Sequence, residues 1–177
     1  MRSESKRGIM SRKILLAALV GLLFAACETS ELKPLVLDGH KLHASLVTQQ
    51  IDDVPRLHVD RAVLRGNPQL STDAKFIEAI ARSGSQGRLG GEGVRAALYA
   101  LYRGESEVGF YGLEAASTAD ADRLESLLRE IWAHNASLDR ARVHRGSKVV
   151  LVVWNDGVSA SCWEATNAAV VDHLAAP

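Results

Sequence analysis

The spacing of hydrophobic and polar positions changes several times along the chain, and in the C-terminal half each change predicts one element. Residues Glu107 to Leu113 alternate in the manner of a strand, with Val108 and Phe110 on one face. Ser117 or Thr118 is then expected to cap a helix. The apolar stripe of that helix consists of Leu124, Leu127, Leu128 and Ile131. A helix with a single apolar stripe is expected to dock on a sheet.

Two strands are predicted next. Ala141 to His144 forms the first, and Arg145-Gly146-Ser147 forms the turn after it. Val149 to Trp154 contains only apolar residues. Continuous apolarity of this length predicts a central strand that is covered on both faces.

A last helix completes this half of the chain, after turn chemistry at Asn155-Asp156-Gly157. It is predicted from near Ser161 to about Leu174, with Ser161 and Glu164 as a capping box. The order strand, helix, strand, strand, helix indicates an α+β fold with helices packed on a small antiparallel or mixed sheet. The same order resembles part of the ferredoxin-like plan, with one strand missing unless the N-terminal half supplies it.

The middle of the chain is predicted to hold two helices around a glycine-rich loop. Ser71 or Thr72 caps the first helix, which is expected to end at Gly84. The loop, Ser83 to Gly93, is followed by no lysine-serine or lysine-threonine pair, so a linker is favoured over a phosphate-binding loop. Val94 to Arg103 is predicted to be the second helix. The positions at helical spacing in these two helices are Phe76, Ile77, Ile80, Val94, Ala97, Leu98 and Leu101.

Two alternatives are open for the start of the domain. Leu35-Val36-Leu37 and Leu42 to Val47 form a hairpin if Asp38-Gly39 is its turn, whereas a helix from His40 to Gln50 fits nearly as well. A strand is expected from Leu57 to Leu64, and the sequence Gly66-Asn67-Pro68 ends it.

The first 27 residues follow a different pattern. A basic stretch ends at Arg12-Lys13, and Ile14 to Ala26 contains no charged or strongly polar side chain. A helix that crosses a bilayer needs about 20 apolar residues, so this shorter run favours an export signal. The run ends in Leu23-Phe24-Ala25-Ala26-Cys27, which resembles the lipobox of bacterial lipoproteins, with Phe24 where leucine is usual.

This resemblance implies cleavage before Cys27 and acylation of its thiol. The chain is then divided into a signal peptide (1–26), a lipidated tether (27–34) and a single domain (35–177), with Met10 as an alternative start. Because Glu28 rather than aspartate follows the cysteine, the resemblance implies the periplasmic face of the outer membrane in a host with two membranes. The alternatives are an ordinary core or disulfide cysteine and cleavage by the general signal peptidase.

Composition and charge support an ordinary globular domain. The chain has 177 residues, of which 47% are hydrophobic, and its formal charge is zero. Five basic residues and one acidic residue lie in the first 26 positions, so the remainder carries a formal charge of −4. A mildly acidic domain does not attract phosphate backbones, which excludes nucleic acid as the expected partner.

Acylation of Cys27 leaves Cys162 as the only thiol of the mature chain, so no internal disulfide is expected. At the start of the last helix, this thiol would be stabilised as a thiolate by the helix dipole. His144 and His173 are candidate imidazole partners if the fold brings either close. Burial of an inert Cys162 beside Trp163 is the favoured interpretation.

Two further clusters contain the residue types of functional sites. Asp38, His40 and His43, joined by His58 and Asp60, have the residue types of a zinc site, although solvated surface histidines are favoured. Acidic residues also surround the entry to the long helix, where the helix dipole explains them better than acid–base catalysis does. These are Glu114, Asp120 and Asp122.

The sequence therefore predicts no catalytic residue, metal ligand or cofactor, and one modified residue, Cys27. The favoured function is a noncatalytic binding or accessory domain of the cell envelope. Its expected partners are membrane lipid through Cys27 and an envelope protein or small ligand. The alternative is an envelope enzyme that uses Cys162 as a reactive thiol.

Overall fold

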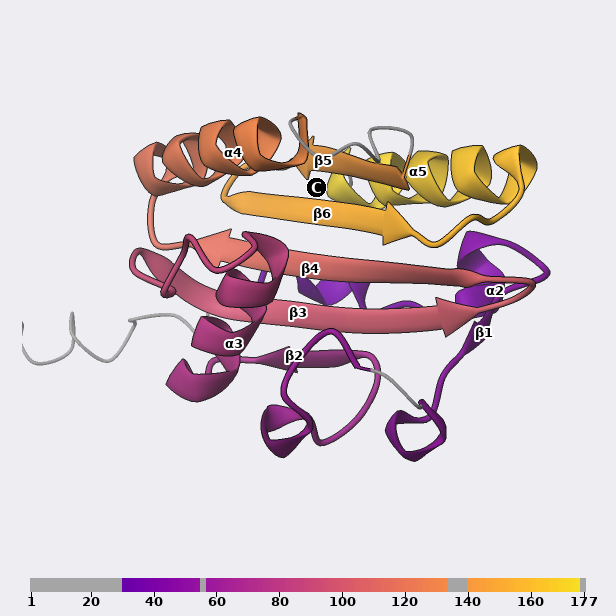
Figure 1. The fold of residues 1–177 in the computed structure, drawn as a ribbon. Helices are drawn as coiled ribbons and strands as arrows, with labels where there is room; N and C mark the ends of the chain where they lie inside the picture. The colour runs from indigo at the N-terminus through magenta and orange to yellow at the C-terminus, as the bar shows by residue number, and fades with distance from the viewer. Residues whose placement is uncertain (1–29, 55–56, 134–139, 176–177) are drawn as a thin grey trace, which may run out of the picture.

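The computed structural model describes residues 30–54, 57–133 and 140–175. Its centre is a six-stranded antiparallel sheet with the order β1-β3-β4-β6-β5, in which β2 also pairs with β3 (Figure 1). The strands are β1 (Val47–Thr48), β2 (Gln69–Ser71), β3 (Val94–Arg103), β4 (Glu107–Ala115), β5 (Ala141–Arg145) and β6 (Val149–Asn155). The predicted α+β class is confirmed.

Helices cover both faces of this sheet. They are α2 (Gly39–Leu42), α3 (Ala74–Gly84), α4 (Thr118–Ala133) and α5 (Ala160–Ala175), with 3-10 turns η1 (Lys33–Leu35), η2 (Ile51–Asp53) and η3 (Arg61–Val63). Figure 1 shows α3 in front of the sheet, with α5 and the N-terminal segment behind it. Within the described residues, no helix has the length and apolarity needed to cross a membrane.

The sheet separates two hydrophobic cores. In the first, Tyr111 and Val152 pack with side chains of α3 and α4. In the second, Phe110 and Leu151 pack with α5 and with the N-terminal segment. Every residue of β6 is buried, which confirms the prediction of a strand covered on both faces.

The prediction of a helix from Val94 to Arg103 is wrong, because this segment is strand β3. Ala96 to Tyr102 is buried throughout, with alternate side chains in the two cores. A strand that is apolar at every position also has apolar residues at helical spacing, so periodicity cannot identify it. Pairing with β4 along its length decides in favour of the strand.

Neither alternative for the start of the domain is correct. Asp38 caps a single helical turn, α2, by accepting a hydrogen bond from the His40 amide (3.2 Å). The chain then extends into β1 instead of returning as a hairpin. Leu57 to Leu64 is also not a strand, since it contains η3, capped by Asp60. Leu32 is fully buried, so residues 30–34 belong to the domain and not to a tether.

Two of the three predicted helix caps differ from those observed. Asp73, two residues after Ser71, caps α3 by accepting hydrogen bonds from the amides of Lys75 and Phe76. At α4 the prediction is correct, because the Ser117 hydroxyl accepts a hydrogen bond from the Asp120 amide (3.1 Å).

At α5 the capping hydroxyl belongs to Ser159, which accepts a hydrogen bond from the Cys162 amide (3.3 Å). Ser161 and Glu164 therefore do not form the predicted capping box. Glu164 instead forms a two-pronged ion pair with Arg142 on β5.

The ferredoxin-like order holds only as far as β6. Strand β6 lies between β4 and β5, so β4, α4, β5 and β6 form a split β-α-β unit. In the ferredoxin-like plan the second helix covers the same face as the first, whereas here α5 packs on the face opposite α4. The position beside β4 is occupied by β3.

Candidate functional site

A cleft of about 370 Å³ lies over the sheet between the C-terminal ends of α3 and α4. We call it the aromatic cleft. It is lined by His58, Ser83, Tyr111, Trp132, Arg140, Trp154, Asn155 and Asp156. Its volume is near the lower end of the roughly 300–1,000 Å³ typical of small-molecule sites.

The floor of the cleft is a row of aromatic rings. The ring centroids of Tyr111 and Trp154 are 6.2 Å apart, with an angle of 26° between their planes. His58 packs edge-on against Trp154 with a centroid distance of 4.7 Å. Tyr99, which is not part of the lining, extends the row with its ring centroid 6.1 Å from that of Tyr111. Such contacts hold the rings in fixed orientations.

Gly109 makes room for the Trp154 indole. The two residues are paired across β4 and β6. A Cβ atom at Gly109 would lie 2.2 Å from the Trp154 ring, so the indole lies against the bare backbone.

Two polar groups of the aromatic row lack partners. The Trp154 Nε1 and the Tyr99 hydroxyl are buried, and neither forms a hydrogen bond within the described residues. Buried indole and phenol groups normally have a partner. Burial raises the pKa of Tyr99 and of Tyr111 far above the usual phenol value, so both hydroxyls stay protonated at neutral pH.

The wall and rim of the cleft are also defined. Trp132 is fixed in place because its Nε1 donates a hydrogen bond to the Gly84 carbonyl at the end of α3 (2.9 Å). At the rim, Arg140 and Asp156 form an ion pair at 3.3 Å, and more than half of each side chain is exposed. The cleft therefore combines fixed rings with charged and hydrogen-bonding groups at its opening.

Cys162 lies in a second, smaller cleft of about 180 Å³, whose lining includes His43, Ser45 and Glu105. The thiol residue is only 3% exposed. His43 is oriented by the Ser45 hydroxyl, which lies 2.8 Å from its Nδ1. The sequence did not pair His43 with Cys162, because the two are far apart in the chain.

The two histidines considered as partners of Cys162 have other contacts. His144 Nε2 lies 2.7 Å from the Asn167 side-chain oxygen, and His173 Nδ1 lies 2.7 Å from the Ala169 carbonyl. Burial lowers the pKa of His144, which favours its neutral form.

The structure does not assemble the suggested metal cluster. His40 and His43 contact the Ala44 carbonyl and the Ser45 hydroxyl, while His58 packs in the aromatic cleft on the other face of the sheet. Asp38 and Asp60 serve as helix caps. Across residues 30–54, 57–133 and 140–175, no group of three or more metal-binding side chains is placed to hold an ion.

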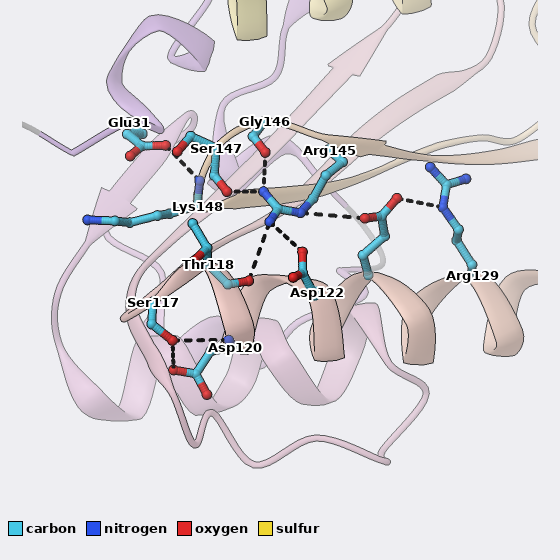
Figure 2. Close-up of polar contacts among 11 residues, drawn as sticks. Glu31, Ser117, Thr118, Asp120, Asp122, Arg129, Arg145, Gly146, Ser147 and Lys148 are labelled. Carbon is cyan, nitrogen blue, oxygen red and sulfur yellow. Dashed lines mark hydrogen bonds and ion pairs between the residues drawn. The ribbon is translucent and has the colours of Figure 1, made fainter.

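The acidic residues around α4 also have structural partners. Asp120 accepts a hydrogen bond from the Ser117 hydroxyl (2.7 Å), and Asp122 pairs with Arg145 at 2.9 Å. Figure 2 shows Arg145 between α4 and the β5–β6 turn, where it also donates to the carbonyls of Gly146 and Ser147. These contacts fasten the start of α4 to the sheet.

Glu114 differs from the two aspartates because it is fully buried. Its carboxylate pairs with Arg95, whose Nε lies 2.9 Å from Oε1. The same carboxylate accepts hydrogen bonds from the Ser30 hydroxyl and from the Glu31 amide. Glu31 in turn accepts a hydrogen bond from the Lys148 amide at 2.9 Å (Figure 2). Glu114 thus fixes the first described residues to the sheet.

Comparison of the chain with family models, curated proteins and solved structures gives no significant match. The aromatic cleft was also not predicted, although the sequence holds a signal for it. Trp154 ends an otherwise aliphatic run, and Gly109 interrupts the strand that pairs with it. A glycine opposite a large ring indicates that the ring lies across the neighbouring strand.

Proposed function

We propose that the protein is an exported lipoprotein, anchored through acylated Cys27, whose domain is a noncatalytic binding module of the cell envelope. The observation that carries the proposal is the arrangement of its two ends. The chain is fixed to the sheet three residues after Cys27, and the aromatic cleft lies at the opposite end of the same strands.

The distances involved are short. From Cys27 to Ser30 an extended chain reaches about 10 Å, so the sheet end at Glu114 and Val149 would be held near the membrane surface. Trp154 lies five residues along β6 from Val149, which corresponds to about 17 Å. The cleft would therefore face away from the membrane, where it could meet a ligand or an envelope protein.

The lining of the aromatic cleft favours binding over catalysis. Among the described residues, its lining contains no cysteine and one imidazole, that of His58, which is packed against Trp154. The acidic residues Glu114, Asp120 and Asp122 are engaged in ion pairs and hydrogen bonds elsewhere.

Cys27→Ala is expected to abolish incorporation of labelled palmitate and to release the protein from the membrane fraction. The reason is that acyl chains contribute about 0.8 kcal/mol per buried CH₂ and would be the only anchor proposed here. Radiolabelling and fractionation of cells that express each form measure both effects. In the matched control, Cys162→Ala, the label and the membrane fraction should be unchanged. Recovery of unlabelled wild-type protein from the cytosol would contradict the proposal.

A second candidate function is an envelope enzyme that uses Cys162, since His43 lines the same cleft. In such an enzyme the imidazole would take the thiol proton and leave a nucleophilic thiolate.

Alkylation separates the two candidates. In the Cys27→Ala protein, where Cys162 is the only thiol, we expect iodoacetamide to react slowly until the fold is denatured, because Cys162 is 3% exposed. Intact mass over time measures the reaction. Rapid labelling of the folded protein that is slowed by His43→Ala would favour the enzyme.

A further inference from the structure

We infer that the aromatic cleft binds a saccharide, through one or two pyranose rings. The inference rests on the proposed export, because it assigns the cleft a ligand class of the envelope. It goes further by naming the chemistry that the cleft recognises.

The first argument is the combination of surfaces. A pyranose ring has an apolar face of C–H bonds and an edge of hydroxyl groups, so its sites join an aromatic platform to planar polar side chains. The partly exposed ring of Trp132 is the platform that the cleft offers, while Tyr111 and Trp154, which are more than nine-tenths buried, form the floor beneath it. Arg140 and Asp156 supply planar donors and acceptors at its opening.

The second argument is the unpartnered donor. Trp154 is 93% buried, since only 7% of it is exposed, and its Nε1 has no acceptor within the described residues. An indole N–H can only donate, so the partner that it lacks is an acceptor such as a hydroxyl oxygen. A sugar hydroxyl meets this need if the indole, whose Nε1 is itself buried against Gly109, turns toward the cleft on binding.

The volume of the aromatic cleft and the charges at its rim narrow the class of ligand further. A volume of about 370 Å³ suits a small ligand and not a long chain in full. Among the described residues of the rim, the charges of Arg140 and Asp156 balance because the two form an ion pair. A neutral polar ligand fits this rim better than an anion or a cation does.

The test uses the purified full-length protein in detergent, with chitotriose and maltotriose as probes and indole as an aromatic probe without hydroxyls. Tryptophan fluorescence reports on the cleft, since Trp132 and Trp154 line it while Trp163 packs in the core on the other face. We expect a saturable change with at least one trisaccharide at concentrations up to about 10 mM.

Three variants locate the binding. Trp132→Phe is expected to weaken binding by roughly threefold to tenfold through loss of ring area, and Trp154→Phe by a similar factor because it removes the N–H donor. The matched control is Trp163→Phe, which should bind as the wild type does. Calorimetry gives the affinities without dependence on the fluorophore that each variant removes.

Several results would overturn the inference: no saturable change with either trisaccharide, binding of indole alone, or equal affinity in all three variants. Because Trp132 is only partly buried, Trp132→Phe also provides a test if Trp154→Phe does not fold. Palmitate labelling of the same preparation tests lipid anchoring separately. Failure of the ligand inference is therefore distinct from failure of the proposed export.

Discussion

Replacement of Glu114 by alanine is expected to lower the free energy of unfolding by about 3 kcal/mol. The carboxylate is fully buried, and it is bonded to Arg95, Ser30 and Glu31. Its removal leaves the partly buried guanidinium of Arg95 without this partner, and the penalty for such a charge exceeds the value of the contact itself. Residues at the start of the domain also lose their attachment to β4.

Urea denaturation of wild-type and variant proteins measures this effect. Glu78→Ala is a matched control, since Glu78 forms an exposed ion pair with Arg82 on α3, which is worth roughly 0.3–0.5 kcal/mol. Limited proteolysis of Glu114→Ala should show earlier cleavage near Ser30. Equal stability losses in the two variants would show that Glu114 does not fasten the N-terminal segment.

The second large effect is expected for Gly109→Ala, with a loss of about 2–3 kcal/mol. The new Cβ would lie 2.2–2.5 Å from three atoms of the Trp154 ring, which is closer than real contacts allow. The indole must move, and its contacts with Tyr111 and His58 move with it.

The measurement combines urea denaturation with the wavelength of tryptophan emission. Gly66→Ala is the control, because a Cβ at Gly66 meets nothing within 4 Å. We expect the control to stay within about 0.5 kcal/mol of the wild type. An unchanged emission spectrum and stability in Gly109→Ala would mean that Trp154 does not lie across this glycine.

The C-terminal half could be predicted because its local signals agree with the fold. The stripe from Leu124 to Ile131 and the apolar run from Val149 to Trp154 each fit one type of element by length and spacing. Strand β3 could not be predicted in this way. Its apolar residues fit two periodicities, and only pairing with β4, which is a non-local interaction, selects between them.

The caps and the cleft were missed for related reasons. Ser159 and Asp73 are as suitable for capping as Ser161 and Ser71, so composition alone does not distinguish them. The cleft unites Tyr111, Trp132 and Trp154, which come from three elements. A site built across elements needs the sheet order, which the sequence does not contain as a local pattern.

The two-sided sheet has a consequence for how the domain loses its structure. Successive side chains of β6 point into opposite cores, with Val152 in one and Leu151 in the other. Both helical layers pack on the same strands, one on each face of the sheet. Detachment of either layer would therefore expose the apolar face that it covers, on strands that the other layer needs for its own packing. Neither half can therefore melt while the other persists, and the domain should behave as a single cooperative unit.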